Sequence, residues 1–257
     1  MSSPIWTAAA LSSEAVSLDG KVWRLVEAQH RVSTLKLVDT LDEQALLEDL
    51  IEETKPAIPA ECRHLDYLLA TPFRYGSVYP QGSRFRRAGR TRGVYYAAEH
   101  VATAVAEMAF YRLLFFADSP DTPWPGDAAE YTAFSAAIRT ERAVDLTRPP
   151  LSRDSTHWTA HSDYEACQAL ADAAREAELH AIRYRSVRDP EGRANVALLT
   201  CLAFARSRPV DRQTWRIRLS ASGVQALCEF PRRRIGFGRA DLLGDPRLAG
   251  LVWERKA

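Results

Sequence analysis

The residues with the clearest potential for chemistry lie within positions 72–116. Arg74 precedes a loop that carries Arg84 and four further arginines, a short apolar stretch containing Tyr96 follows, and an alanine-rich run then holds one acid, Glu107. Guanidinium groups bind phosphates through paired hydrogen bonds, and aromatic rings stack on bases. A fixed carboxylate favours positive charge that develops on a ribose. Such a set could hold a dinucleotide and strain its ribosyl bond.

Three helices are expected to position or support these residues. The first covers 40–55, where Thr40 and Glu43 form a capping box. The second covers 100–116 and places Glu107 beside its apolar stripe, where a carboxylate is half desolvated. The third covers 162–179, and the pair of residues expected to form its capping box is Ser162 and Glu165.

Short apolar or alternating stretches predict the strands. A buried strand is expected at 67–71 and another at 93–98. The stretches 181–187 and 195–204 flank a turn, so they predict a hairpin that carries Ser186 near the end of its first strand. Alternation of Trp215, Ile217 and Leu219 marks a late strand.

Three regions give weaker signals. The stretch 131–144 is compatible with a strand pair or with irregular structure, and the polar stretch 146–158 is expected to be a surface excursion. The tail 231–239 (PRRRIGFGR) is basic, but its GFG is too short to indicate a phosphate loop.

The composition indicates an ordinary globular protein. The 257 residues are 46% hydrophobic and 26% charged, with a net charge of +1, so anion binding must come from local clustering. The four cysteines show no CxxC and no metal-ligand spacing, which favours buried free thiols. No run of about 18 apolar residues and no signal-peptide pattern are found, so a cytoplasmic protein is expected.

The order of three residues resembles the RES domain, the toxin of many bacterial toxin–antitoxin pairs. They are Arg74 in PFRY, Glu107 in YAAEHVATAVAE and Ser186 in RYRSVRDPEG. The spacing from Tyr96 to Glu107 (107 − 96 = 11) and the small residues between them also fit that family.

The resemblance implies an α+β fold like that of ADP-ribosyltransferase toxins, with a split mixed β-sheet core flanked by helices. It implies a catalytic unit over 61–257 with an N-terminal helical extension over 1–60 packed on it. It also implies an enzyme that cleaves the nicotinamide–ribose bond of NAD, by phosphorolysis, by hydrolysis or by ADP-ribosyl transfer to a protein. The expected partner is an Xre-like antitoxin with a helix-turn-helix, and no metal is implied. The extension and an insertion at 124–158 depart from compact members and leave the acceptor open.

The resemblance also assigns site residues. The catalytic residues would be Arg74, Glu107 and Ser186. The residues expected to bind the dinucleotide are Tyr75, Arg84, Tyr96, Arg31, Arg188 and Asn195. Each has a plainer alternative, since an acid can simply pair with a nearby arginine, a loop arginine can be solvated, and a tyrosine at a strand end can belong to the core.

Two other function classes remain open. The arginine loop 84–92, interleaved with aromatic residues, could bind nucleic acid through phosphates and stacking. The chain could also be an inactive scaffold that only binds a partner. Other enzyme classes fit poorly, because the sequence has no GxSxG elbow, no GxGxxG after a strand and no HExxH.

Overall fold

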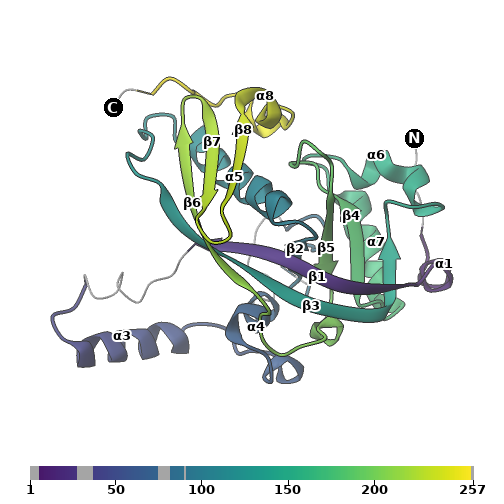
Figure 1. Cartoon of the computed structure of the whole chain (residues 1–257). Coiled ribbons are helices and arrows are strands. Elements are labelled where there is room, and N and C mark those ends of the chain that lie inside the picture. Colours follow the sequence, from purple (N-terminus) through teal and green to yellow (C-terminus); the bar gives the residue numbers. More distant parts are fainter. Residues whose placement is uncertain (1–5, 28–36, 75–81, 90, 256–257) are drawn as a thin grey trace.

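The computed structural model describes residues 6–27, 37–74, 82–89 and 91–255, and these form a mixed α+β fold (Figure 1). The strands are β1 (Val16–Glu27), β2 (Tyr95–Ala98), β3 (Ala129–Asp145), β4 (Ala181–Arg185), β5 (Ala194–Leu198), β6 (Arg212–Ser220), β7 (Gly223–Cys228) and β8 (Arg233–Gly238). The α-helices are α1 (Ala8–Ser13), α3 (Leu41–Glu53), α4 (Tyr67–Arg74), α5 (Val101–Asp118), α6 (Ser155–Trp158), α7 (Glu165–Glu176) and α8 (Arg239–Leu242). The short 3-10 turns are η1 (Ala60–Cys62), η2 (Leu151–Asp154), η3 (Cys201–Ala203) and η4 (Pro246–Leu248).

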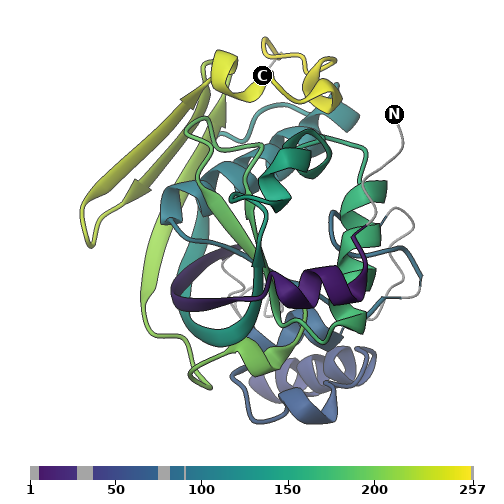
Figure 2. The same ribbon diagram turned by 90° about the vertical axis from the view of Figure 1, so that its right-hand side faces the viewer.

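The eight strands form one sheet in the order β1-β2-β5-β4-β3-β6-β7-β8, and β1 also pairs with β3. The β3–β4 pair is parallel and the other pairs are antiparallel. One edge of β3 pairs with β6 near its start and with β4 near its end, so the sheet divides along β3. Figure 1 shows β1 and β3 running side by side across the molecule, and Figure 2 shows the β7–β8 hairpin projecting from the body.

Three clusters of buried side chains hold the helices against this sheet. Helix α5 packs on the β6–β7 side through Phe110 and Leu113, which meet Trp215. Helix α4 contributes Leu69 and Phe73 to a second cluster with β2, β3 and β5. Helix α7 packs against β4 in the third. Because α5 spans the region between the two parts of the sheet, it can carry a side chain into the space between them.

Several sequence expectations are confirmed. Thr40 and Glu43 form the capping box of α3. Helix α5, strand β2 and the β4–β5 hairpin lie where they were expected. The late strand is β6, with its alternating residues Trp215, Ile217 and Leu219 buried. All four cysteines are buried and free.

The expected strand at 67–71 is wrong, because this stretch is helical. Burial of Leu69, Ala70 and Phe73 follows helical spacing, and the Asp66 carboxylate accepts the backbone N–H of Leu68 at 2.9 Å. An acidic residue just before a short apolar run is a helix-start signal. A run of this length cannot be assigned from hydrophobicity alone, and the cap decides it.

The expected capping box of the third helix is also wrong. Helix α7 begins at Glu165, and its backbone N–H is accepted by Asp163, not by Ser162. Most of the stretch 146–158 lies at the surface as expected, but Leu151 and Trp158 are each 2% exposed and anchor it in the core. The Trp158 indole donates to the Leu151 carbonyl at 2.7 Å, which satisfies its N–H inside the core.

Four further stretches have structures that the sequence did not predict. The stretch 131–144 lies within one long strand, β3, and β5 ends at Leu198 before a 3-10 turn. The basic tail contains β8. The N-terminal 60 residues supply not only a helix but also β1, which pairs with β2 and β3 inside the sheet. Because β1 pairs with both β2 and β3, the sheet would be incomplete without the N-terminal residues.

Gly93 allows α4 to pack against the entry to β2. A Cβ atom at this position would lie 1.9 Å from the Pro72 carbonyl oxygen and 2.8 Å from Phe73 Cα. Because backbone cannot yield as a flexible side chain does, we expect Gly93→Ala to lower the free energy of unfolding by about 1–3 kcal/mol or more. Urea denaturation measures this change.

Gly126→Ala is the matched control for that measurement. A Cβ atom at Gly126 would meet no atom within 4 Å. We expect its free energy of unfolding to stay within about 0.5 kcal/mol of the parent. Equal stability of the Gly93 and Gly126 variants would contradict the close approach of α4 to β2.

Candidate active site

A cavity of about 270 Å³ lies where α5 covers β1, β2 and β5. Its walls come from β1, β2, α5, the loop before β2, and the segment that follows β4. The lining residues are Trp23, Arg24, Leu25, Ser83, Arg84, Tyr96, Ala97, Ala98, Ala104, Glu107, Met108, Tyr111, Tyr164, Tyr184, Arg188 and Asn195. Aromatic rings, three guanidinium groups and a single carboxylate therefore face one space.

Glu107 is held by donors on both of its oxygens. Its Oε1 accepts hydrogen bonds from Ser186 Oγ at 2.7 Å and from Asn195 Nδ2 at 2.6 Å. Its Oε2 lies 3.6 Å from Arg188 Nη1. The Glu107 side chain keeps 22% of its exposure, at the cavity. A carboxylate fixed in this way presents negative charge in one orientation and does not need to reorganise during a reaction.

The turn after β4 places Ser186 at the carboxylate. Ser186 Oγ accepts hydrogen bonds from the backbone N–H groups of Arg188 and Asp189, at 3.2 and 3.1 Å. Its hydroxyl in turn donates a hydrogen bond to Glu107. Asp189 in turn accepts a hydrogen bond from Thr103 on α5 at 2.6 Å and pairs with Arg193. Thr103 and Glu107 both lie on α5, so the hydrogen bond between Thr103 and Asp189 fixes the position of the turn relative to Glu107.

The negative charge of Asp189 strengthens its hydrogen bond with Thr103. Burial acts to raise the pKa of Asp189, but the hydrogen bonds from Arg193 and Thr103 outweigh burial and bring the pKa below its ordinary value. The carboxylate therefore stays ionised near neutral pH and keeps its hold on α5.

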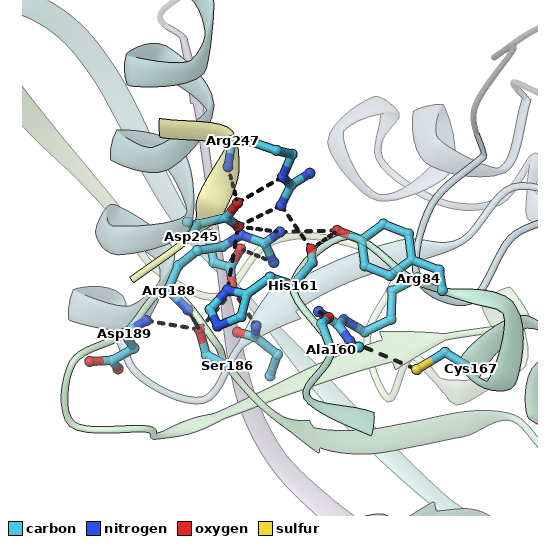
Figure 3. A network of polar contacts seen from close by, with 12 residues as sticks. Arg84, Ala160, His161, Cys167, Ser186, Arg188, Asp189, Asp245 and Arg247 are labelled. Atoms are coloured by element: carbon cyan, nitrogen blue, oxygen red, sulfur yellow. Dashed lines mark hydrogen bonds and ion pairs between the residues drawn. The ribbon is translucent and has the colours of Figure 1, made fainter. Parts of the chain in front are cut away.

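Arg188 lies between the Glu107 carboxylate and Asp245 of the C-terminal segment, and Figure 3 shows it beside Asp245. It is 9% exposed, its Nη2 donates to the Tyr164 hydroxyl at 3.1 Å, and its guanidinium lies 4.5 Å from the centre of the Phe110 ring. Nη2 also lies 3.9 Å from Asp245, which is bound by Arg247 through two further hydrogen bonds. Burial acts to lower the pKa of Arg188, and the charge of Glu107 leads the contributions that raise it overall.

Arg84 is buried and pairs with no carboxylate among the described residues. Its Nη1 donates to the Trp158 carbonyl at 2.6 Å and its Nη2 to the Ala160 carbonyl at 2.8 Å, while its guanidinium lies 4.8 Å from the centre of the Tyr164 ring. These contacts hold a positive charge at the cavity wall without neutralising it (Figure 3).

The Tyr96 hydroxyl shapes the loop before β2. It accepts the backbone N–H of Phe85 at 3.0 Å and lies 2.8 Å from Ser83 Oγ. Burial raises the pKa of Tyr96 to about 12, although the hydrogen bond with Ser83 acts in the opposite direction. The hydroxyl is therefore neutral, and both of its contacts go to the protein. Tyr96 lines the cavity together with Ser83.

We expect Tyr96→Phe to lower the free energy of unfolding by about 1–3 kcal/mol, because the Phe85 N–H then loses its acceptor. Tyr67→Phe is the control, since Tyr67 lies on α4 and is 62% exposed. Thermal or urea unfolding of the two variants measures the difference. Equal stabilities would mean that the Tyr96 hydroxyl does not hold the loop.

Some expected site residues lie elsewhere. The structure does not bring Arg74 to the cavity, because its guanidinium pairs with Glu52 on α3 at 2.7 Å and donates to the Pro56 carbonyl at 2.8 Å. Tyr75 and Arg31 lie outside the described residues. The structure thus brings together Glu107, Ser186, Asn195, Arg188, Arg84 and Tyr96.

Other lining residues were not anticipated. Arg24 and Trp23 come from β1, which the sequence did not reveal as a strand, and Tyr111 lies one turn beyond Glu107 on α5. The spacing of Tyr111 from Glu107 could have been read from the helix. No local signal marks Asp245, which reaches Arg188 only through tertiary packing.

Within the part of the chain that the structure describes, no cluster of three or more His, Cys, Asp or Glu side chains could hold a metal ion. No described helix is both long enough and apolar enough to cross a bilayer.

Comparison with known proteins identifies the family. The model of the RES domain matches residues 58–220, more than half of the chain. The chain belongs to the RES-domain family. The RES match contains Glu107, Ser186 and Asn195, whereas Arg24 and Asp245 lie outside it.

One solved structure similar to this RES protein is the crystal structure of the M. tuberculosis MbcT–MbcA toxin–antitoxin complex. The sequences are 11% identical, the TM-score is 0.44, and the match covers 93% of this chain and 95% of that chain. No curated protein matches the sequence.

Proposed function

We propose that this RES protein is the toxin of a toxin–antitoxin pair and cleaves the nicotinamide–ribose bond of NAD. The observation that carries the proposal is the carboxylate of Glu107, held by Ser186 and Asn195 at an aromatic cavity that is also lined by the guanidinium groups of Arg24 and Arg84. Family membership supports the same reading.

The chemistry follows from the charges in the substrate. When the bond between ribose C1′ and the nicotinamide nitrogen breaks, its electron pair neutralises the cationic ring and positive charge develops on the ribose. A carboxylate that is already oriented stabilises this charge more in the transition state than in the ground state. Glu107 takes this role, and it needs no proton transfer because nicotinamide leaves as a neutral molecule.

The neighbouring residues have supporting roles. Ser186 and Asn195 orient the carboxylate, and Arg188 holds its second oxygen. Arg84 adds positive charge that favours the pyrophosphate, and Tyr96 supplies a ring face for stacking. Arg74 is assigned no role in this site, because Glu52 already pairs with it.

The remaining features belong to the same proposal. Tyr75 and Arg31 stay candidates for NAD binding, and the likeness of the core to ADP-ribosyltransferases is part of the hypothesis. Phosphate as acceptor would give ADP-ribose 1″-phosphate and nicotinamide, whereas water would give ADP-ribose, nicotinamide and a proton. A protein side chain is the third acceptor. The partner we propose is an Xre-like antitoxin that blocks the cavity, and the site of action is the cytoplasm.

The nucleic-acid alternative has less support from the arginine loop 84–92. Arg84 points inward to carbonyl groups, and Arg87 pairs with Asp172 at 2.6 Å. A phosphate backbone would need these side chains to be free and exposed. The inactive-scaffold alternative is separated from an enzyme by turnover of NAD.

Product analysis tests the proposal. The purified protein is incubated with NAD, with and without inorganic phosphate, and the products are separated and identified by mass. Release of nicotinamide is expected, and the accompanying ADP-ribosyl product reports the acceptor. Intact NAD after prolonged incubation of folded protein would overturn the proposal and favour the scaffold.

A further inference from the structure

Helix α3 exposes leucines and acids together on one of its sides. Its sequence, LDEQALLEDLIEE, contains six acids and no basic residue. Leu46 and Leu50 are 61% and 51% exposed, and Asp49 and Glu53 are exposed beside them. The spacing of these four residues is i, i+3, i+4 and i+7, which places them on one side of the helix. Together they form the α3 surface.

Most of α3 lies in solvent. Gln44 is the buried residue of this helix, and Glu52 ties its C-terminal end to Arg74 of α4. Figure 1 shows α3 to one side of the sheet. A helix of 13 residues is only marginally stable in water, and helices in proteins gain most of their stability by packing an apolar side. The exposed leucines therefore indicate that a further surface covers α3.

A basic surface with an apolar centre lies on the exposed side of β6, β7 and β8. The sequences of these three strands contain five arginines and no acid. Arg216 is the cross-strand partner of Leu227, and Leu227 is the partner of Arg234. Cross-strand partners share one side of a sheet, so Leu227, which is 39% exposed, has an arginine on each flank. Arg216, Leu227 and Arg234 form the β6–β8 surface.

The charges of the β6–β8 surface are not neutralised within the described part of the chain. Both Arg216 and Arg234 are exposed, and neither forms an ion pair within 4.0 Å with a described Asp or Glu. This holds even for Glu130 of β3, which lies opposite Arg216 in the β3–β6 pair. The other side of the three strands packs under α5 through residues such as Trp215. The exposed side is therefore available to an anionic partner.

The α3 surface and the β6–β8 surface match in chemistry and in size. Each has leucine next to charged residues, and the charges are of opposite sign. The 13-residue helix is about 20 Å long, and the nine-residue strand β6 is about 30 Å long. The outer two of the three strands lie about 10 Å apart, close to the diameter of a helix. Figure 1 shows α3 well apart from the β7–β8 hairpin, so the contact needs two copies of the chain.

We propose that α3 of one copy docks on the β6–β8 surface of a second copy. Its leucines pack against Leu227, and its acids lie beside Arg216 and Arg234. Exchange of both helices between two copies gives a closed dimer with two equal contacts. The proposal is independent of the NAD reaction, because neither surface contributes a residue to the lining of the cavity.

Charge reversal in the full-length protein tests this contact. One variant carries Arg216→Glu with Arg234→Glu and reverses the β6–β8 surface. The second carries Asp49→Lys with Glu53→Lys and reverses the α3 surface. Sedimentation velocity measures the mass of each protein over a range of concentrations, at about 0.05 M and about 0.5 M salt. Circular dichroism establishes that each variant is folded.

The matched control carries Arg153→Glu with Arg206→Glu. Both arginines are exposed, and neither lies on α3 or on the strands β6 to β8. This control changes the net charge by the same amount as the reversal of the β6–β8 surface. It therefore separates a specific contact from the effect of overall charge.

The parent and the control are expected to form a dimer that weakens at high salt. In each reversed variant alone, the dissociation constant of the dimer should rise roughly tenfold or more, because charges of like sign then face each other. An equal mixture of the two reversed variants should restore the dimer. In that mixture each α3 surface again meets a β6–β8 surface of opposite sign.

Three results would overturn the contact. The first is a parent protein with the mass of a single chain at every concentration, whether or not its basic surface then binds duplex DNA. The second is a dimer that both reversed variants keep unchanged. The third is a mixture that associates no more than the separate variants do. Failure to release nicotinamide would contradict the proposed function and leave these measurements unaffected.

Discussion

Glu107→Gln is expected to lower the rate of nicotinamide release by roughly 10²–10³-fold or more, with a smaller effect on stability, because the buried Arg188 loses one charged partner but keeps Asp245 and Tyr164. The size of the effect follows from removing an oriented charge next to the developing positive charge on the ribose. Glutamine keeps the shape of the side chain, and its amide oxygen can still accept from Ser186 and Asn195, which now bond to Oε1. The protein should therefore still fold, and the loss of activity should appear in kcat. Timed chromatography of nicotinamide measures it.

Asp118→Asn is the matched control for that change. Asp118 is the exposed last residue of α5, so this substitution removes one negative charge from the same helix far from the cavity lining. We expect it to leave the rate unchanged. A Glu107→Gln protein that is folded at the assay temperature and still consumes NAD at the parental rate would remove Glu107 from the mechanism.

Arg188→Met is expected to lower the free energy of unfolding by about 3 kcal/mol. Methionine can fill the space beside Phe110, but Glu107 then loses its only guanidinium partner within 4.0 Å among the described residues. This value is at the low end of the free-energy cost of removing one partner of a buried ion pair, because the Glu107 side chain is 22% exposed. Asp245 should be affected less, since Arg247 still binds it.

The double variant Arg188→Met/Glu107→Gln tests this explanation. Without a charge at position 107, the cost of the lost guanidinium should shrink, giving a coupling of about 1–2 kcal/mol in a double-mutant cycle. Urea denaturation of the parent, both single variants and the double variant supplies the four free energies. Strict additivity would show that Arg188 stabilises the fold through Phe110 and Tyr164 and not through Glu107.

Local signals in the sequence were sufficient for features whose partners are near in the chain. The Thr40–Glu43 capping box, the helix that carries Glu107 and the alternation of β6 each depend on residues a few positions apart. The same locality explains the errors. A short apolar run at 67–71 fits a strand or a helix until the Asp66 cap is recognised, and β1 has no simple alternation to reveal it.

The resemblance to the RES domain predicted that Glu107 and Ser186 act together, and their side chains lie 2.7 Å apart. Only the tertiary structure decided which arginines join them. Arg74 is separated from the cavity by its pair with Glu52, whereas Arg188 and Arg24 reach it from distant parts of the chain. Long side chains take their partners from whatever the packed backbone brings within reach. For that reason residue type and order predicted the chemistry of the carboxylate, while the sheet and α5 determined which charges surround it.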